Sequence, residues 1–222
     1  MVTVFDIARS SSLEEIKLFI TNTEKLNGVF KYSAQYGRLD IVKFLVLNGA
    51  NIHTDCDHAV RWAADQNHLD MVKFLVLNGA NIHACYEWAL NYAAQNGHLD
   101  IVKFLVLNGA DIHVIGDRAF TNAAFMGRVD VVKFLVLNGA NIRASNDHAL
   151  KWSRNINVLN FLLSKIVPKE CEYSVEADLY KLIPSDHELK KIIDRVIASR
   201  ALMKQRLHKS LILSDVNIAC YD

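Results

Sequence analysis

Apolar residues dominate the ten-residue segment 99–108, which reads LDIVKFLVLN. Only Asp100 and Lys103 are charged, so apolar positions run almost all the way round a helix. An ordinary surface helix has a single apolar stripe, so this pattern favours a helix packed between neighbours. A shorter stretch with small and apolar residues at helical spacing, 89–94, precedes it, and Asn96-Gly97 separates the two. The pattern therefore predicts a pair of helices joined by a turn.

This pair of helices is repeated along the chain. Close copies of the apolar segment occur at 39–48, 69–78 and 129–138. The glycine that follows each copy recurs with a 30-residue period, at Gly49, Gly79, Gly109 and Gly139. A period of this length is typical of stacked repeats, in which each unit buries its apolar face against its neighbours. We therefore predict an all-α solenoid of stacked helix-turn-helix repeats.

The repeated unit resembles an ankyrin repeat. The segments ALNYAA (89–94), GHLD (97–100) and GADI (109–112) match the family pattern in order and spacing, and the match covers roughly residues 5–164. The resemblance implies an ankyrin-repeat solenoid that binds other proteins.

The unit departs from the ankyrin pattern in two ways. The 30-residue unit is shorter than the family's unit of about 33, and the shortening falls in the finger between repeats. In addition, Trp88-Ala89 replaces the Thr-Pro of the family's TPLH element. This short, proline-free style is similar to that of ankyrin proteins encoded by giant viruses. The departures argue against a binding mode that depends on long projecting fingers.

The repeat boundaries suggest a domain organisation for the whole chain. A terminal repeat must expose one face to water, and the polar Ser10-Ser11-Ser12 replaces the glycine turn in the first unit. The expected units are a degenerate N-terminal capping repeat at 1–26, four ankyrin repeats at 27–56, 57–86, 87–116 and 117–146, a degenerate last repeat at 147–166, and a helical C-terminal extension at 167–222.

Composition narrows the choice of partners. Of the 222 residues, 25 are Lys or Arg and 24 are Asp or Glu, so no overall field recruits nucleic acid or an anionic membrane. The four cysteines are scattered without a C-x-x-C pair, which favours free thiols in a reducing compartment. Asp6 and Arg9 argue against a signal peptide, and no apolar run approaches the ~18 residues of a membrane span. We expect an intracellular, cytoplasmic protein, in the host cytoplasm if it is viral.

Aromatic residues recur at one position of the first helix of the repeat. Tyr32, Trp62, Tyr92 and Trp152 share this position, which Asn122 interrupts. By resemblance, the position borders the concave face where ankyrin proteins commonly bind partners, and Trp and Tyr dominate interface hot spots. Alternatively the rings only stack between neighbouring first helices, and both can hold at once. The candidate partner-binding residues, including the expected fingertips Asp57, Trp88 and Arg118, are Tyr32, Asp57, Arg61, Trp62, Trp88, Tyr92, Arg118, Lys151 and Trp152.

Leucines form a second series, at a position where the family usually carries a charged residue. They are Leu47, Leu77, Leu107 and Leu137. Leu107 follows Asp100 and Lys103 by seven and four residues, which places all three on one outer face of the second helix. Either neighbouring lysine stems partly cover these leucines, or they form a second contact surface for self-association or for the C-terminal extension.

A third series, His53, His83, His113 and Arg143, raises the possibility of a metal site. Equivalent residues in stacked repeats stand about 8–10 Å apart, whereas ligands of one zinc ion each lie about 2.0–2.1 Å from the metal. We therefore expect no metal and no cofactor. No catalytic pattern of nucleophile, base or phosphate-binding glycines appears, so we expect a non-enzymatic protein without a small-molecule substrate.

The segment after Val167-Pro168 leaves the repeat pattern. Residues 185–197 predict an amphipathic helix that is rich in Lys and Arg, and 179–213 is faintly similar to the start of an F-box. The main prediction is a module that binds an unidentified protein through the concave face, as a monomer or with weak self-association. The alternatives are a ubiquitin-ligase substrate adaptor that uses 179–213 and, less in keeping with the charge balance, a nucleic-acid binder that uses the basic helix.

Overall fold

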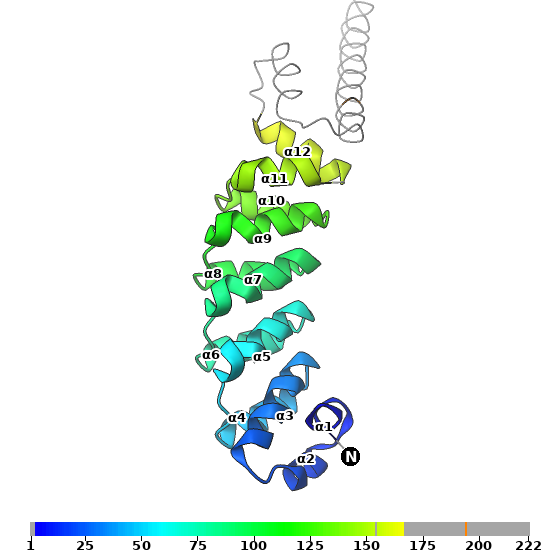
Figure 1. Cartoon of the computed structure of the whole chain (residues 1–222), viewed down its shortest axis with the longest axis vertical. Helices are drawn as coiled ribbons and strands as arrows, with labels where there is room; N and C mark the ends of the chain where they lie inside the picture. Colours follow the sequence, from blue (N-terminus) through cyan, green and yellow to red (C-terminus); the bar gives the residue numbers. More distant parts are fainter. Residues whose placement is uncertain (1–2, 154, 167–193, 195–222) are drawn as a thin grey trace, which may run out of the picture.

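The computed structural model describes residues 3–153, 155–166 and 194. In this part of the chain every regular element is a helix, and successive pairs of helices stack along one long axis (Figure 1). The helices are α1 (Val4–Ser10), α2 (Leu13–Phe19), α3 (Thr23–Gln35), α4 (Leu39–Leu47), α5 (Thr54–Asp65), α6 (Leu69–Leu77), α7 (Ala84–Asn96), α8 (Leu99–Leu107), α9 (Val114–Phe125), α10 (Val129–Leu137), α11 (Ala144–Trp152) and α12 (Ile156–Ile166). The predicted all-α repeat solenoid is confirmed, whereas the expected extension, 167–222, lies outside the described residues apart from Asp194.

The two helices of the N-terminal pair are short and begin with reciprocal caps. In α1 the Thr3 hydroxyl accepts a hydrogen bond from the Asp6 backbone N–H, and the Asp6 carboxylate accepts one from the Thr3 N–H at 3.0 Å. The Thr3 hydroxyl also donates to the Asp6 carboxylate at 2.6 Å, and this hydrogen bond, with a smaller contribution from the Thr3 N–H, lowers the pKa of the Asp6 carboxyl. Ser12 and Glu15 form the same capping box in α2. Capping satisfies backbone donors that a seven-residue helix would otherwise leave free.

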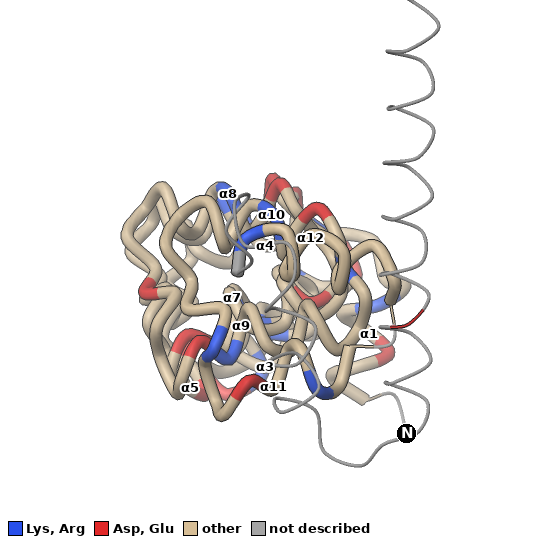
Figure 2. Tube along the Cα trace, turned by 90° about the horizontal axis from the view of Figure 1, so that it is seen from above, with Lys and Arg blue, Asp and Glu red and all other residues tan. Residues whose placement is uncertain are grey.

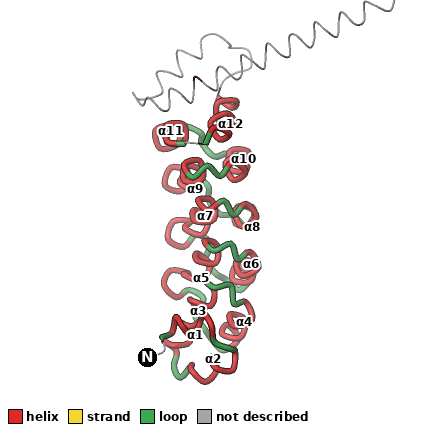
Figure 3. Tube along the Cα trace, turned by 90° about the vertical axis from the view of Figure 1, so that its right-hand side faces the viewer, coloured by secondary structure: helices red, strands yellow, loops and turns green. Residues whose placement is uncertain are grey.

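The helices form two columns, as Figure 3 shows. One column holds the first helices of the pairs (α3, α5, α7, α9 and α11) and the other holds the second helices (α4, α6, α8, α10 and α12). Neighbouring first helices pack far more closely than neighbouring second helices do. Fully buried alanines permit this close approach, namely Ala63, Ala64, Ala93, Ala94, Ala123 and Ala124. Closer packing in one column favours curvature of the array toward the first helices, and we therefore call their exposed side the concave side.

Larger side chains fill the wider spacing between second helices. Ile101, Val102 and Leu105 of α8 are buried in the core, and equivalent residues do the same in the other copies. In each copy, the phenylalanine just before the buried leucine is part-buried and lies between neighbouring second helices. The Lys43 ammonium of one second helix stands 5.9 Å from the ring centroid of Phe74 in the next. Second helices are thus held together by apolar contacts between side chains that are larger than the alanines between first helices.

Each first helix from α5 onward contains a tight left-handed turn close to its N-terminal end. Three consecutive residues adopt φ between 51° and 63° in each of four turns, at 55–57, 85–87, 115–117 and 145–147. A left-handed turn costs roughly 1–2 kcal/mol for each residue that has a Cβ, and Gly116 is the only glycine among the twelve. The shortened repeat therefore has a strained, compact turn where a longer finger would project.

Two sets of hydrogen bonds join neighbouring repeats on the first-helix side. In the turn bridges, a side-chain oxygen at the end of one turn accepts the backbone N–H of a residue 24 positions later; Asp57 Oδ1 accepts from Asn81 N at 2.8 Å. The other turn bridges join Asn27 to Asn51, Glu87 to Asp111 and Asp117 to Asn141. The acceptor side chains at 57, 87 and 117 are buried, so these hydrogen bonds are shielded from water.

The second set, the carbonyl bridges, lies at the turn between the two helices of a pair. The side chain just before each second helix bonds to a backbone carbonyl of the preceding repeat, and His68 Nε2 lies 3.1 Å from Gln35 O. The equivalent bonds are Arg38 to Ser11, His98 to Asp65 and Arg128 to Gln95. The His68 ring needs the space above Gly37, because a Cβ there would stand 2.7 Å from the ring, and Gly37 has φ of +71°.

Candidate partner-binding face

The first helices leave a narrow stripe of side chains facing away from the core. In α5 the residues that lie between His58, Trp62 and Asp65 in the sequence are buried, while these three are part-exposed. They are spaced by four and three residues, so they share one helix face. The same positions in α3, α7, α9 and α11 form a continuous surface along the concave side, which we call the concave stripe.

Rings occupy much of the concave stripe and touch one another. Starting at Phe5 of α1, successive centroids lie 5.5 Å apart to Tyr32, 6.1 Å on to His58, 5.5 Å to Trp62, 6.3 Å to Tyr92 and 5.5 Å to Trp88. These separations are typical of stabilising aromatic pairs. We call these six residues the aromatic run. The rings stack on one another and are also partly exposed, so their stacking does not exclude contact with a partner.

The aromatic run stops where the column of rings is interrupted. Asn122 follows Tyr92 in this column, and Arg118 beside it is exposed. A separate cluster begins in the same column one repeat later, where the His148 ring lies 6.4 Å from both Phe125 and Trp152. Trp152 is 53% exposed. The concave stripe thus has a long aromatic section and a short one, with a polar gap between them.

The aromatic run carries little net charge. The Lys31 ammonium donates to the Asp55 carboxylate at 2.7 Å, which lowers the pKa of that carboxyl, and it also stands 4.9 Å from the Tyr32 ring centroid. Burial, with smaller contributions from Lys31 and Arg61, lowers the pKa of His58 to about 4. His58 is therefore uncharged at neutral pH and acts as a further ring of the run.

Two residues expected to contact a partner are instead buried near the start of α5, in or close to its left-handed turn. Asp57 is 5% exposed, and its carboxylate binds His53 Nδ1 at 3.0 Å as well as the Asn81 N–H. Arg61 is 8% exposed; its Nε donates to Cys56 O at 2.8 Å and its Nη2 to Asp55 O at 2.6 Å. These differences from the sequence-based expectation arise because the left-handed turn points its carbonyls inward, where Arg61 satisfies them.

Other residues form the tips of the turns. Tyr86 is 72% exposed and Ile115 is 53% exposed, each inside a left-handed turn. Neither residue is among the candidates that the sequence pattern indicated. The sequence nevertheless contained the signal, because an acid recurs with the 30-residue period at Asp57, Glu87, Asp117 and Asp147, while the residues just before it vary from copy to copy. A recurring acid in a variable segment indicates a structural role and leaves the variable residues as tips.

The histidine series pairs with this acid series. His53, His83 and His113 each bond through Nδ1 to the acid four residues later, and Arg143 bonds to Asp147 at 3.5 Å. Each of these three histidine rings therefore fixes the side chain that accepts a turn bridge. Among the residues that the structure describes, no group of three or more His, Cys, Asp or Glu side chains could hold a metal ion.

The leucine series lies on the opposite column and is open to solvent. Leu47, Leu77, Leu107 and Leu137 are 86%, 83%, 82% and 73% exposed. Lysine stems therefore do not cover them; on α8, the Lys103 ammonium instead lies 3.9 Å from the Asp100 carboxylate. Whether the leucines contact another molecule stays a prediction. Seen along the long axis, charged residues of both signs occur around the array (Figure 2).

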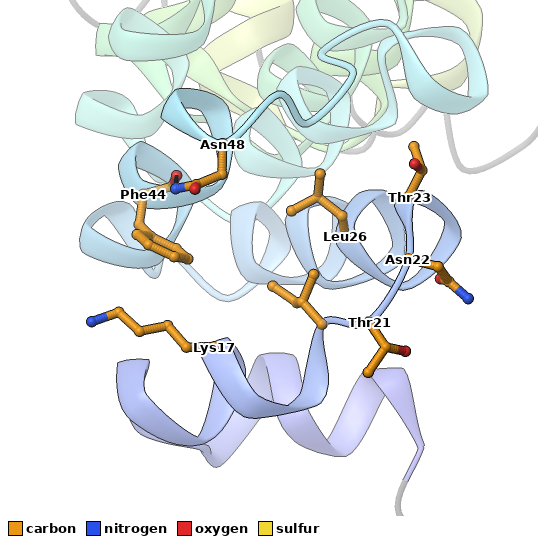
Figure 4. A pocket seen from close by; sticks show the side chains of 8 residues that line it. Lys17, Thr21, Asn22, Thr23, Leu26, Phe44 and Asn48 are labelled. Carbon is orange, nitrogen blue, oxygen red and sulfur yellow. Dashed lines mark hydrogen bonds between the residues drawn. The ribbon is translucent and has the colours of Figure 1, made fainter.

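A small open groove occurs at the N-terminal end of the second-helix column, with a volume of about 400 Å³ (Figure 4). It forms because α2 has seven residues and α4 has nine, so α2 does not cover the end of α4. Its walls are Lys17, Ile20, Thr21, Asn22, Thr23, Leu26, Phe44 and Asn48. The mixture of single polar groups with apolar side chains includes no pair of groups suited to acid–base or metal chemistry.

A comparison with protein families decides the family. The model described as ankyrin repeats, three copies, matches residues 5–84, 30–116, 60–146 and 90–175. The chain belongs to the ankyrin-repeat family. Ankyrin repeats are in general protein–protein interaction modules and generally non-enzymatic. A comparison with curated proteins gave no match.

Some predictions fall outside these findings. No helix in the described part of this ankyrin array is long and apolar enough to cross a membrane, whereas the intracellular, cytoplasmic location stays a prediction. The F-box-like segment, 179–213, and most of the basic helix lie outside the described residues. The two alternative functions that depend on them are therefore not addressed by this structure.

Proposed function

We propose that the chain binds a protein partner through the concave stripe, with the aromatic run as the main contact surface. The observation that supports this proposal most strongly is the unbroken run of six rings across four helices on one part-exposed face. Trp and Tyr bury large areas with little loss of rotamer freedom, which is why they dominate interface hot spots. Tyr32, Trp62, Trp88 and Tyr92 are the proposed central contacts.

The stacking of the rings supports a preorganised binding surface. Each ring of the run is already held by a neighbouring ring, and the Arg61 guanidinium lies 5.4 Å from the Trp88 ring centroid beneath the stripe. Ordering side chains on binding costs about 0.5–1.5 kcal/mol for each flexible residue. A partner of the aromatic run would avoid part of this cost.

The chemistry of the run also restricts the partner. His58 is uncharged at neutral pH and Lys31 is already paired with Asp55, so the run favours an apolar or aromatic segment over a highly charged one. Arg118, Lys151 and Trp152 would contact the far end of a longer partner. Asp57 and Arg61 are not proposed as contacts, because both are buried.

The experiment begins with affinity capture from cell lysate and continues with the purified partner. Dissociation constants are then measured for the wild type and for Tyr32→Ala/Trp62→Ala/Tyr92→Ala. We expect at least a tenfold loss of affinity, since single hot-spot residues contribute about 2 kcal/mol or more. Circular dichroism must first show that the variant is folded. Undiminished affinity in a folded triple variant would contradict the proposal.

Two controls accompany this experiment, a substitution at the equivalent position of another repeat and a truncation. Asn122→Ala removes a side chain from the same column without removing a ring, so it should change the affinity little. Truncation after Val167 should also preserve binding. Loss of binding on truncation alone would assign recognition to 168–222 and leave the ankyrin array as a scaffold.

A further inference from the structure

Two cysteines lie in neighbouring left-handed turns of the array. Cys56 is the middle residue of the turn 55–57, and Cys85 is the first residue of the turn 85–87. Cys56 is exposed, Cys85 is part-exposed, and both thiols are free. The binding face described above uses neither of them.

The repeat supplies an independent view of how these two positions meet. Cys56 is equivalent to Gly116, and Cys85 is equivalent to Ser145, so the two pairs have the same separation along the chain. The turns have closely similar backbone angles, with φ of 57° at Cys56 against 63° at Gly116, and 53° at Cys85 against 51° at Ser145. The turn bridge beside each pair is also the same, from Asp57 to Asn81 and from Asp117 to Asn141.

The Gly116–Ser145 pair is in direct contact. The Ser145 hydroxyl donates to Gly116 O at 3.1 Å, and a Cβ built on Gly116 would stand 2.9 Å from Ser145 Oγ. Transferred to the equivalent pair, this places the Cβ of Cys56 close to the Sγ of Cys85. In a disulfide the Cβ of one cysteine lies about 3 Å from the sulfur of the other, given the standard bond lengths and angles.

The direction in which the pKa of the Cys85 thiol is shifted is consistent with this placement. The side-chain interaction with Cys56 is the largest cause that raises the pKa of the Cys85 thiol. A raised pKa keeps Cys85 mostly protonated at neutral pH, so the more exposed Cys56 is the thiol that an oxidant meets first.

We propose that Cys56 and Cys85 are a reversible oxidation site that forms a disulfide between neighbouring turns on reaction with a low-molecular-weight disulfide. The Cys56 thiolate attacks one sulfur of the small disulfide, forms a mixed disulfide and releases one small thiolate. Cys85 then loses its proton to water and attacks Cys56 Sγ, which releases the second small thiol. Two protein thiols are oxidised, and the two electrons reduce one small disulfide to two thiols.

The disulfide would join the first and second full repeats beside the tip residue Tyr86. It would constrain the left-handed turns at the start of α5 and α7, and these helices carry Trp62, Trp88 and Tyr92. Oxidation would therefore fix the relative positions of the two central helices of the aromatic run. This inference does not depend on the proposed function.

The test uses the full chain in a Cys171→Ser/Cys220→Ser background. The protein is equilibrated in glutathione buffers of increasing oxidised fraction, the remaining thiols are alkylated, and peptides are mapped by mass spectrometry. We expect a Cys56–Cys85 crosslink within one chain and a rise of several degrees in the thermal midpoint. Stable glutathione adducts on both cysteines, or crosslinks between chains, would overturn the proposal.

Two engineered pairs make the result specific to the geometry. Gly116→Cys/Ser145→Cys in a background without other cysteines should also form a disulfide, because these positions are already in contact. Cys85→Ser/Tyr86→Cys, which moves the second thiol to the exposed tip, should accumulate the glutathione adduct instead. If this shifted pair crosslinks as readily as Cys56 and Cys85, turn flexibility and not the placement of the thiols explains the bond, and the proposal is wrong.

Discussion

The two helix columns of the array solve the same stacking problem in different ways. The second helices are nearly identical in sequence, lie farther apart, and are separated by bulky apolar side chains. The first helices differ in sequence, yet they pack closely through buried alanines and are flanked by turn bridges and carbonyl bridges. Hydrogen bonds to backbone groups tolerate sequence change better than interlocking apolar side chains do. The variable column is therefore the one that can carry a binding surface.

The largest expected effect comes from the buried arginine of the first-helix column. Arg61→Ala removes both donors to the carbonyls of Asp55 and Cys56, and hydrogen bonds to charged groups contribute about 1.5–3 kcal/mol each. We expect the free energy of unfolding to fall by about 2–4 kcal/mol, measured by urea denaturation. Asn91→Ala is the matched control, because Asn91 makes one bond of 3.3 Å to Tyr86 O. Equal losses in the two variants would show that the guanidinium contacts contribute little.

The next effect depends on pH and on His58. Its pKa is about 4 in the folded chain and near 6.5 when unfolded, so the unfolded chain binds the proton first as the pH falls. The stability contributed by the neutral ring is complete above pH 6.5 and is lost between pH 6.5 and 4. Allowing for partial exposure, the loss is about 1–2 kcal/mol. The unfolding free energies of the wild type and of His58→Gln are compared at pH 7 and at pH 4.5. If the difference between the two proteins is the same at both pH values, the predicted loss of stability on protonation of His58 is wrong.

A smaller effect of opposite sign in two variants tests the strain in the turns. Tyr86→Gly removes a Cβ from a left-handed residue and should raise the unfolding free energy by about 1 kcal/mol, less the entropy that glycine adds to the unfolded chain. Gly116→Ala, at the equivalent of Cys56, should lower it by about the same amount, because the new Cβ would meet Ser145 Oγ at 2.9 Å. Thermal denaturation of both variants gives the signs. A destabilised Tyr86→Gly would mean that contacts of the tyrosine ring outweigh the backbone strain.

The smallest effect on stability is expected on the outer face of the second-helix column. Leu47→Glu/Leu77→Glu/Leu107→Glu/Leu137→Glu changes side chains that are at least 73% exposed. Substitutions of this kind usually stay within about 0.5 kcal/mol each, so folding should persist. Sedimentation velocity at high concentration should show less self-association than the wild type. If the variant unfolds, the leucines contribute to the core after all.

The sequence predicted the fold, but it did not predict the conformation of the turns or which candidate residues they bury, and the reason is physical. The 30-residue period and the apolar second helix are sufficient for a stacked solenoid, because apolar burial leaves a periodic trace. The left-handed turns leave no such trace, since they contain Cys, Tyr, Ile and Ser with a single glycine. A sequence with ordinary residues at these positions does not indicate positive φ angles.

Arg61 shows why the burial of a candidate residue was hard to predict from the sequence. It occupies the same repeat position as Asn91, Thr121 and Lys151. A position that varies among polar residues is also typical of an exposed surface, so the sequence gives no sign that Arg61 is buried. Only the structure reveals that Arg61 lies over the turn and satisfies two carbonyls. The aromatic positions were easier to predict, because rings at one position of successive repeats must be near one another whether they stack or bind.

The carbonyl bridges have a consequence for the length of the array. Their acceptors are backbone oxygens at Gln35, Asp65 and Gln95, so every repeat offers the same acceptor whatever its side chain. Deleting residues 87–116 would bring Arg128 to Asp65 O, an atom equivalent to its present partner. A unit can therefore be removed or duplicated without designing a new junction. The length of the array, and with it the length of its binding face, can therefore change in steps of one 30-residue repeat.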